Sequence, residues 1–157
     1  DPKRRFLVTG GLAQLLRQDA YPYLCENPDL IPLAVEEMCR FVSPVTHMRR
    51  TAAADMEISG QAIKAGEKVV LWFASGNRDE RQFADPDTLV LDRKPNHHIG
   101  FGVGAHFCLG AHLARLETKL LFEALIKHIR SIELVGEPER VASNWFTAWS
   151  AMHVKWQ

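Results

Sequence analysis

FGVGAHFCLG, residues 101–110, places one cysteine after a glycine-rich turn and at the start of a long amphipathic segment. Cys108 therefore stands where backbone N–H groups and the positive end of a helix dipole favour a deprotonated sulfur. Gly102, Gly104 and Gly110 permit unusual backbone angles and leave room for a flat, bulky group beside the main chain. The stretch predicts a thiolate metal site whose other ligands do not come from the protein, and haem iron fits that description.

A structural zinc site and a disulfide both fit the cysteines less well. Structural zinc takes four protein ligands, usually in closely spaced pairs. Cys25 and Cys39 lie far upstream without such spacing. His106 stands only two residues before Cys108, which suits neither a helical pair nor a paired-cysteine turn. Three cysteines also leave one over from any disulfide, and the sequence opens without a secretory segment.

A catalytic cysteine nucleophile remains open as an alternative for Cys108. His97, His106 or His112 could act as its base. That alternative leaves the crowding of the cysteine by Phe101 and three glycines unexplained. On the residue pattern alone we favour haem ligation over a nucleophilic or a structural cysteine.

Size and charge indicate the class of protein. The 157 residues are 46% hydrophobic and 24% charged, as in one ordinary globular domain. With 19 basic and 19 acidic side chains, no charge excess favours a nucleic acid or an anionic membrane as partner. No apolar run reaches the ~18–20 residues that span a bilayer. We expect a cytoplasmic protein without a transmembrane segment, whose cysteines serve a metal and not cross-links.

Helical patterns cover three parts of the sequence, at residues 12–17, 30–42 and 109–130. Asp29 is the expected N-cap of the second helix, and Pro44 ends it. Leucines recur at helical spacing in the third helix. We expect that stripe to pack into the core.

Strands are expected at residues 50–53, 56–58 and 68–73. The last contains VVLWF, a continuous apolar run, which predicts a strand buried on both faces. Residues 77–96 show no clean period and predict an ordered loop held by three apolar side chains, Phe83, Leu89 and Leu91. A structureless stretch this long inside a domain is usually functional.

The pattern Phe101-x-x-Gly104-x-x-x-Cys108-x-Gly110 resembles the haem-binding loop of the cytochrome P450 family. This resemblance implies that Cys108 is the axial ligand of haem b iron. It also implies that Phe101 packs beside the sulfur, and that His106 contacts a haem propionate.

Two further motifs support the resemblance to the cytochrome P450 family. Glu37-x-x-Arg40 resembles the Glu-x-x-Arg motif of a helix in that family. Residues 76–96, GNRDERQFADPDTLVLDRKPN, resemble its meander, in which Arg93 matches the arginine that pairs with the other two. The resemblance thus implies a buried charge network. Three motifs in the expected order are far more specific than one.

The resemblance implies a fold that is mainly α with small β-sheets, an α+β class. Complete members of the family are much longer, so residues 1–157 are expected to be the C-terminal haem-thiolate portion of a single cytochrome P450 domain. The sequence would then begin near the end of the long helix that crosses the distal haem face. Asp1 could stand at the acid position of that helix, but Lys3 and Arg4 replace the expected alcohol side chains. We therefore assign no catalytic residue within the chain.

Further site residues follow from matching positions in the family. Arg50 is expected to contact a haem propionate, because a guanidinium fork suits a carboxylate. The expected cofactor-binding set is Arg50, Phe101, Gly102, His106, Cys108 and Gly110. The expected substrate contacts are Val45, Thr46, Trp145 and Phe146.

The implied function is a monooxygenase that hydroxylates a lipophilic small molecule, a sterol or branched lipid by resemblance. It would use dioxygen and electrons from a ferredoxin-type iron–sulfur protein, docked where Arg115, Lys119 or His112 presents charge. The alternative is a truncated or diverged haem-binding fragment without catalysis, similar to a haem sensor or carrier.

Overall fold

The computed structural model describes residues 2–157, with side chains from residue 6 onward, so the expectations for Asp1, Lys3 and Arg4 fall outside what it describes. The helices are α1 (Pro2–Arg17), α2 (Tyr21–Glu26), α3 (Ile31–Val42), α4 (Phe73–Gly76) and α5 (Ala111–His128), with 3-10 turns η1 (Pro28–Leu30) and η2 (Gly104–His106). The strands are β1 (His47–Thr51), β2 (Met56–Ile58), β3 (Gln61–Ile63), β4 (Lys68–Trp72), β5 (Ile132–Leu134), β6 (Glu139–Arg140), β7 (Trp149–Ala151) and β8 (Val154–Trp156).

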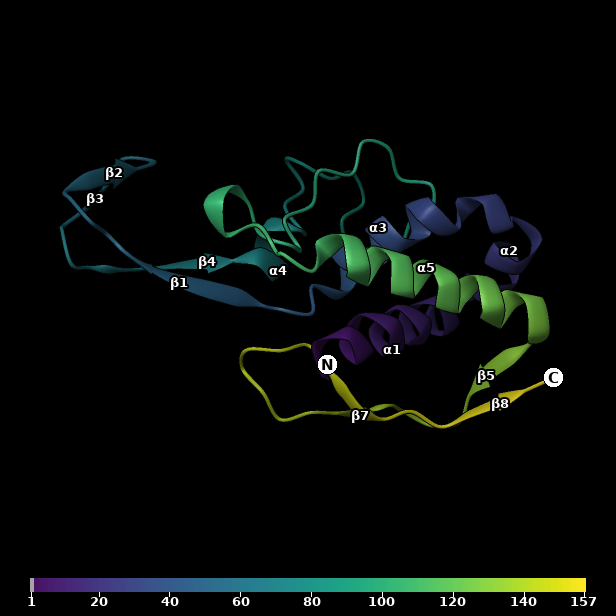
Figure 1. Cartoon of the computed structure of the whole chain (residues 1–157). Coiled ribbons are helices and arrows are strands. Elements are labelled where there is room, and N and C mark those ends of the chain that lie inside the picture. The colour runs from purple at the N-terminus through teal and green to yellow at the C-terminus, as the bar shows by residue number, and fades with distance from the viewer. Residues whose placement is uncertain (1) are drawn as a thin grey trace.

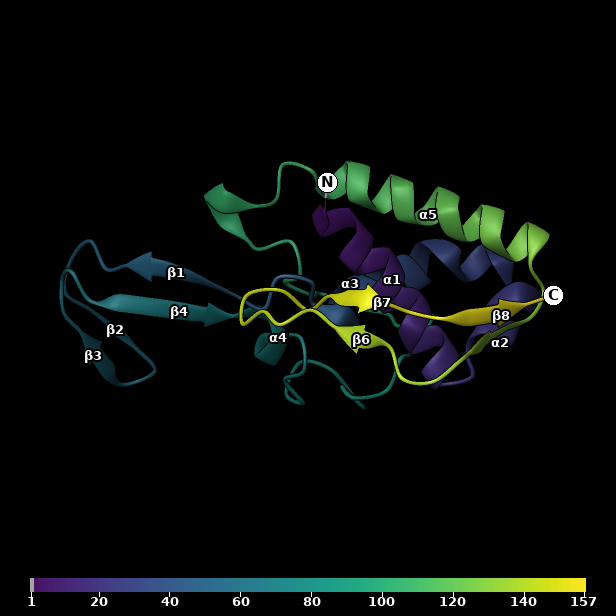
Figure 2. The ribbon, with the colours of Figure 1, turned by 90° about the horizontal axis from the view of Figure 1, so that it is seen from below.

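The described strands pair in four small antiparallel sheets, β1–β4, β2–β3, β5–β8 and β6–β7. Helices α1, α3 and α5 lie side by side, and the C-terminal strands run along α1 (Figures 1 and 2). The predicted class, mainly helical with small sheets, is confirmed. None of the described helices combines the length and hydrophobicity that a membrane crossing requires.

Two glycines set the distance between α1 and α3. A Cβ atom on Gly10 would lie 2.6 Å from Cγ1 of Val42, and one on Gly11 would lie 2.7 Å from Sδ of Met38. Real side chains do not approach so closely. A side chain at Gly10 would therefore force the helices apart at Val42, whereas one at Gly11 would displace the flexible end of Met38.

Several predicted element boundaries were wrong. The helix expected from residue 12 is the end of α1, which begins at Pro2. Asp29 lies inside η1 and does not cap α3, which makes no side-chain cap hydrogen bond. The predicted end of this helix at residue 42 is confirmed, because α3 ends at Val42 and Ser43 adopts a left-handed φ of 43°. Strand β1 begins at His47, three residues before the predicted start.

The prediction that VVLWF is buried on both faces is wrong. Strand β4 pairs with β1 alone among the described strands, and this ribbon projects from the helices (Figure 1). Val70, Leu71 and Trp72 are 42%, 39% and 57% exposed. The continuous apolar run correctly predicted a strand, but no second layer of described residues covers this strand.

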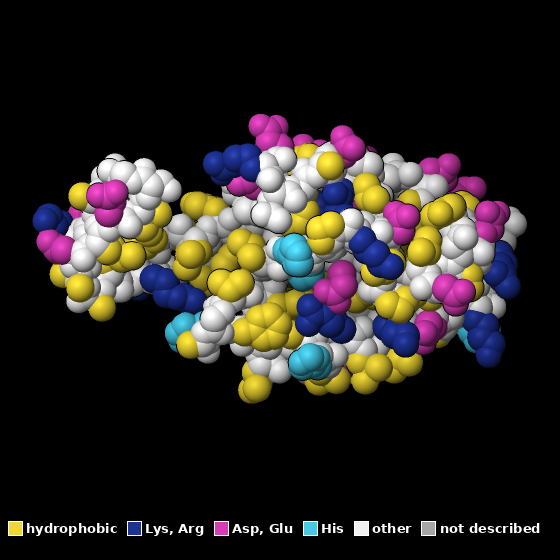
Figure 3. All heavy atoms as spheres, turned by 90° about the horizontal axis from the view of Figure 1, so that it is seen from above, with side chains coloured by type: hydrophobic (Ala, Val, Ile, Leu, Met, Phe, Trp, Pro, Cys, Tyr) yellow, Lys and Arg dark blue, Asp and Glu magenta, His cyan; other side chains and the backbone are white. Residues whose placement is uncertain are grey.

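Most of the leucine stripe of α5 is not core, contrary to prediction, although Leu125 packs against the core. Leu113, Leu116 and Leu120 are 43%, 51% and 54% exposed, whereas Phe122 and Ile126 are buried. Only the face of α5 that carries these last two side chains packs on α1 and α3. Figure 3 shows apolar side chains reaching the surface on the side of the molecule where α5 lies.

The interior of the fold contains a charged cluster centred on Glu37. Its carboxylate oxygens accept from Nε and Nη2 of Arg40 at 2.8 and 2.7 Å. Nε of Arg93 lies 3.1 Å from both oxygens. The backbone N–H of Val90 and the amide of Asn96 complete the shell. Burial raises the pKa of Glu37, but these donors outweigh it and hold the pKa below its usual value.

The same cluster fastens the long loop to α3. Nη1 of Arg40 donates to the carbonyls of Asn77 and Pro86, both at 2.8 Å. Its Nη2 donates to the Thr88 carbonyl. Every N–H of this fully buried guanidinium thus has an acceptor, as a charge without water requires. The expected apolar side chains of the loop, Phe83, Leu89 and Leu91, are buried as well.

We expect Glu37→Gln to lower the free energy of unfolding by about 3–5 kcal/mol, because two buried guanidinium groups would lose their counter-charge. Urea denaturation followed by circular dichroism measures the loss. The matched control is Asp55→Asn, which removes an exposed carboxylate paired with Lys64 at 2.7 Å. This control should cost far less, because exposed ion pairs contribute little to stability. Equal losses in the two variants would contradict a structural role for the buried charges.

Candidate functional site

Residues 100–110 form a tight loop that leads into α5. Gly102 and Gly104 adopt φ of 73° and 70°, a left-handed region that favours glycine. The N–H of Cys108 donates to the carbonyl of Phe101 at 2.9 Å, and the N–H of Ala111 donates to the carbonyl of Cys108 at 3.1 Å. These bonds fix Cys108 between η2 and the first turn of α5.

Cys108 presents its sulfur to the outside of the described structure. The residue is exposed, whereas Cys39 is buried. Burial raises the pKa of Cys39 well above its usual value and also raises the pKa of Cys25, so both favour the neutral thiol. Within residues 2–157, the N–H groups of Leu109 and Gly110 have no backbone acceptor. They remain available to donate to a thiolate at the N-terminus of α5.

Glu36 of α3 stabilises the loop of residues 100–110 through contacts that the sequence analysis missed. Glu36 accepts from Nε and Nη2 of Arg115 at 2.6 and 2.8 Å. Its Oε2 lies 3.0 Å from Nε2 of His98. Nδ1 of His98 accepts from the N–H of Gly100, so Nε2 carries the proton that bonds Glu36. The guanidinium of Arg115 in turn lies 4.5 Å from the ring centre of Phe101.

The two predicted propionate contacts come from separate elements. Arg50 lies half-buried on β1, where its Nη1 donates to the Arg49 carbonyl at 3.1 Å. His106 is exposed at the end of η2. Among the described residues, no carboxylate lies within ion-pair distance of either side chain. Both are therefore free to receive a carboxylate from a ligand.

The four predicted substrate contacts lie together where the segment after α3 meets the C-terminal loop. Val45 and Phe146 form an antiparallel bridge, and the N–H of Thr46 donates to the Trp145 carbonyl at 3.0 Å. The rings of Trp145 and Phe146 stack with centres 4.8 Å apart. Phe6 of α1 joins them, with its ring centre 5.7 Å from that of Phe146. Sequence reasoning missed Phe6, because one aromatic in a helix carries no signal of its neighbours.

Neither a multi-ligand metal centre nor a cysteine–histidine pair forms at Cys108. No group of three or more His, Cys, Asp or Glu side chains in the described residues could hold a metal ion. No histidine of the described residues forms a hydrogen bond with Cys108. The geometry disfavours zinc and a nucleophile with a bound base. It leaves Cys108 as a single, outward-facing sulfur ligand.

Comparison with known proteins places this site in a family. The Cytochrome P450 family model matches residues 27–144, so the chain belongs to the cytochrome P450 family. It is 48% identical over 158 aligned residues to a methyl-branched lipid omega-hydroxylase of Mycobacterium tuberculosis, covering 97% of this chain and 36% of that protein. It is 45% identical over 138 residues to a steroid C26-monooxygenase of Mycolicibacterium smegmatis, covering 87% and 34%.

Solved structures agree with the sequence comparison. P450BioI, in complex with a hexadec-9Z-enoic acid-ligated acyl carrier protein, superposes with a TM-score of 0.96 at 36% identity. The match covers 99% of this chain and 41% of that one. The fold is therefore that of the cytochrome P450 family. The chain spans about a third of the length of the curated relatives it matches.

Haem b is the cofactor of the cytochrome P450 family, and the residues of this loop fit it. Cys108 offers one sulfur, and the glycines beside it leave the main chain open. Around the sulfur, Val103, Phe107 and Leu109 are 66%, 46% and 102% exposed. Apolar side chains this exposed lose contact with water when a flat apolar ring covers them. Arg50 and His106 add cationic or donor groups, neither of which has a carboxylate partner among residues 6–157.

Glu36 should make the stability of this region sensitive to acid. Burial raises its pKa, but His98 and Arg115 lower it to about 2 from an ordinary 4.5. Because the folded pKa lies below the unfolded one, the stabilisation is complete above pH 4.5 and is lost as the pH falls toward 2. We expect the free energy of unfolding to drop over this range by up to about 3 kcal/mol more in the wild type than in Glu36→Gln.

Urea denaturation at a series of pH values measures this difference. Glu57→Gln, on an exposed position of β2, is the matched control and should follow the wild-type curve. Parallel acid profiles for Glu36→Gln and the wild type would show that the contact between α3 and α5 does not contribute.

Proposed function

We propose that residues 1–157 are the C-terminal haem-thiolate portion of a single cytochrome P450 domain. We further propose that the protein is a cytoplasmic monooxygenase that hydroxylates a lipophilic small molecule. Its partners are then dioxygen and a ferredoxin-type electron donor. The observation that carries this proposal is the exposed sulfur of Cys108, held in a glycine loop at the N-terminus of α5.

In this proposal Cys108 ligates the haem iron as a thiolate. The N–H groups of Leu109 and Gly110 donate to the sulfur and limit the charge that it places on the metal. Phe101, fixed between Arg115 and Phe107, shields the sulfur from water. When bound, haem supplies the activation of dioxygen and the insertion of oxygen into a C–H bond.

Arg50 and His106 are proposed to orient the cofactor. A guanidinium donates a fork of N–H groups that matches a carboxylate, and an imidazole N–H donates once. Two such contacts from β1 and η2 would hold the carboxylates of the cofactor. Gly102 and Gly110 let the ring approach the main chain.

The proposed substrate is a sterol or a branched lipid. The relatives named above are a methyl-branched lipid omega-hydroxylase and a steroid C26-monooxygenase. In this chain Val45, Trp145 and Phe146 form an apolar and aromatic cluster, in agreement with a lipophilic substrate. The hydroxyl of Thr46 is hydrogen-bonded to the carbonyls of Asn144 and Trp145, so this residue adds little polarity to the cluster.

The ferredoxin-type donor is proposed to dock near the start of α5. His112 is exposed there, and the Lys119 side chain is 44% exposed. Arg115 is a weaker candidate for this contact, because Glu36 already holds its guanidinium. Electrons would enter on the side of the haem that faces Cys108.

A second candidate function is a haem-binding module without oxygen activation. The sequence favours it at one point, where Lys3 and Arg4 replace the alcohol side chains expected in the distal helix. Both functions predict haem ligation by Cys108. Only the monooxygenase predicts hydroxylated product from dioxygen and an electron donor.

We expect the haem-loaded, reduced and carbon-monoxide-bound protein to show a strongly red-shifted Soret band, because a thiolate donates charge to the iron. Absorption spectroscopy measures the band. Cys108→Ser should abolish the shift, and Cys25→Ser should retain it, since Cys25 lies in α2 away from the loop. A histidine-type spectrum in the wild type would contradict the assignment of Cys108, whereas no haem uptake would mark residues 1–157 as an incomplete haem site.

A further inference from the structure

We propose that a pocket between α1, the end of α3 and the β6–β7 strands binds a small oxyanion that carries several negative charges, either a phosphate compound or a polycarboxylate. The pocket lies apart from the Cys108 loop, and the proposed monooxygenase chemistry does not use it. Its volume is about 280 Å³, near the small end for ligand pockets. The size suits a compact molecule.

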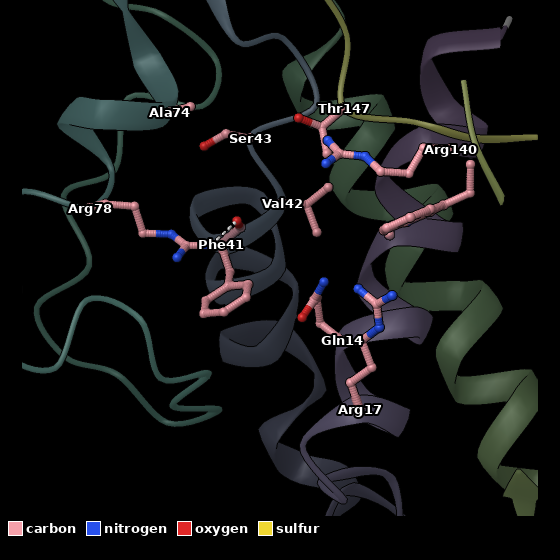
Figure 4. A pocket seen from close by; sticks show the side chains of 11 residues that line it. Gln14, Arg17, Phe41, Val42, Ser43, Ala74, Arg78, Arg140 and Thr147 are labelled. Atoms are coloured by element: carbon pink, nitrogen blue, oxygen red, sulfur yellow. Dashed lines mark hydrogen bonds between the residues drawn. The ribbon is translucent and has the colours of Figure 1, made fainter. Parts of the chain in front are cut away.

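Three guanidinium groups from separate parts of the chain line this pocket. They belong to Arg17 at the end of α1, Arg78 after α4, and Arg140 in β6. Figure 4 shows Arg17, Arg140 and the amide of Gln14 turned toward the same space, whereas the guanidinium of Arg78, on the other side, donates to the Phe41 carbonyl at 3.0 Å. No described lining residue is acidic. The lining thus places three positive charges around one cavity.

The carboxylates that pair with two of these arginines lie outside the pocket. Arg17 contacts Glu137 at 2.5 Å, and the Glu137 side chain is 87% exposed. Arg78 contacts Asp87, whose side chain is 82% exposed. Ion pairs this exposed are weak and readily exchanged. For Arg140, no carboxylate of the described residues lies within ion-pair distance.

Trp149 holds two of the guanidinium groups in place. Arg17 lies 5.1 Å and Arg140 lies 5.5 Å from the centre of its ring. Cation–π contacts of this kind orient a guanidinium while leaving its N–H groups free. The indole Nε1 of Trp149 is buried without an acceptor among the described residues. The lining is therefore rich in donors and poor in negative charge, the complement of a phosphate or a carboxylate.

The test is thermal unfolding of the purified protein with sodium phosphate, sodium citrate, or sodium chloride at matched ionic strength. A ligand that binds the folded state alone raises the midpoint in a saturable way. We expect phosphate or citrate to raise it beyond the chloride control. An effect of phosphate alone assigns a phosphate compound, and an effect of citrate alone assigns a polycarboxylate. No shift beyond chloride would overturn the proposal.

Two variants locate the effect. Arg140→Gln, at an exposed position, should weaken apparent binding at least tenfold and leave the fold intact. The matched control is Arg81→Gln, which removes an exposed arginine paired with Asp79 and should bind like the wild type. Unchanged binding by Arg140→Gln, or an equal loss in Arg81→Gln, would overturn the proposal.

Tryptophan fluorescence gives an independent measurement of the same binding. The oxyanion should change the emission of the wild type with the same saturation as the thermal shift. In Trp149→Phe this change should vanish, because the remaining tryptophans do not line the pocket. An unchanged signal in that variant would place the bound anion elsewhere and overturn the proposal.

Discussion

The carboxylate of Glu37 has no contact with water, yet it connects helix α3 to a loop that lies more than 50 residues further along the chain. It binds Arg40 within its own helix, Arg93 and the Val90 N–H in the long loop, and the amide of Asn96 before the cysteine loop. An isolated charge in this interior would be very costly. The surrounding chain is therefore constrained to supply donors at fixed positions, and the loop cannot rearrange without stranding a charge.

The residue Asn77, which is uncharged, extends this constraint from the Glu37 cluster to the Cys108 loop. Asn77 gives its carbonyl to Arg40, and its side-chain Oδ1 accepts from the N–H of Ile99 at 2.8 Å. Ile99 in turn accepts from the N–H of Gly102, which opens the turn before the cysteine. Hydrogen bonds thus connect the buried Glu37–Arg40 pair to the turn that leads to the exposed Cys108. One carboxylate faces two guanidinium groups, and backbone carbonyls of the loop absorb the excess positive charge.

Sequence reasoning located the elements that have local signals. The pattern around Cys108 indicated its loop, because glycines at fixed spacing are read directly. The helix that carries Glu37 and Arg40 was found within one residue at its start. The Glu36–His98–Arg115 contact was missed, since Glu36 lies more than 60 residues from both of its partners and the three share no period.

The errors at α5 and β4 have one physical origin. The stripe on α5 and the run in β4 are apolar, and an apolar pattern reports a tendency to leave water. It does not report what covers the surface, which depends on residues elsewhere. The misplaced cap at Asp29 is a local competition of another kind, in which a 3-10 turn starting at Pro28 occupies the position where the cap was expected.

The close approach of α1 to α3 determines the size of the aromatic cluster formed by Phe6, Trp145 and Phe146. Phe6 lies one helical turn before Gly10, so the contact of Gly10 with Val42 fixes how far Phe6 extends toward Phe146. A methyl group at Gly10 would push helices α1 and α3 apart. The ring of Phe6 would move with its helix, although no residue of the cluster had changed. The dimensions of this aromatic wall are thus set at a helix crossing, and selection or engineering can adjust them from there.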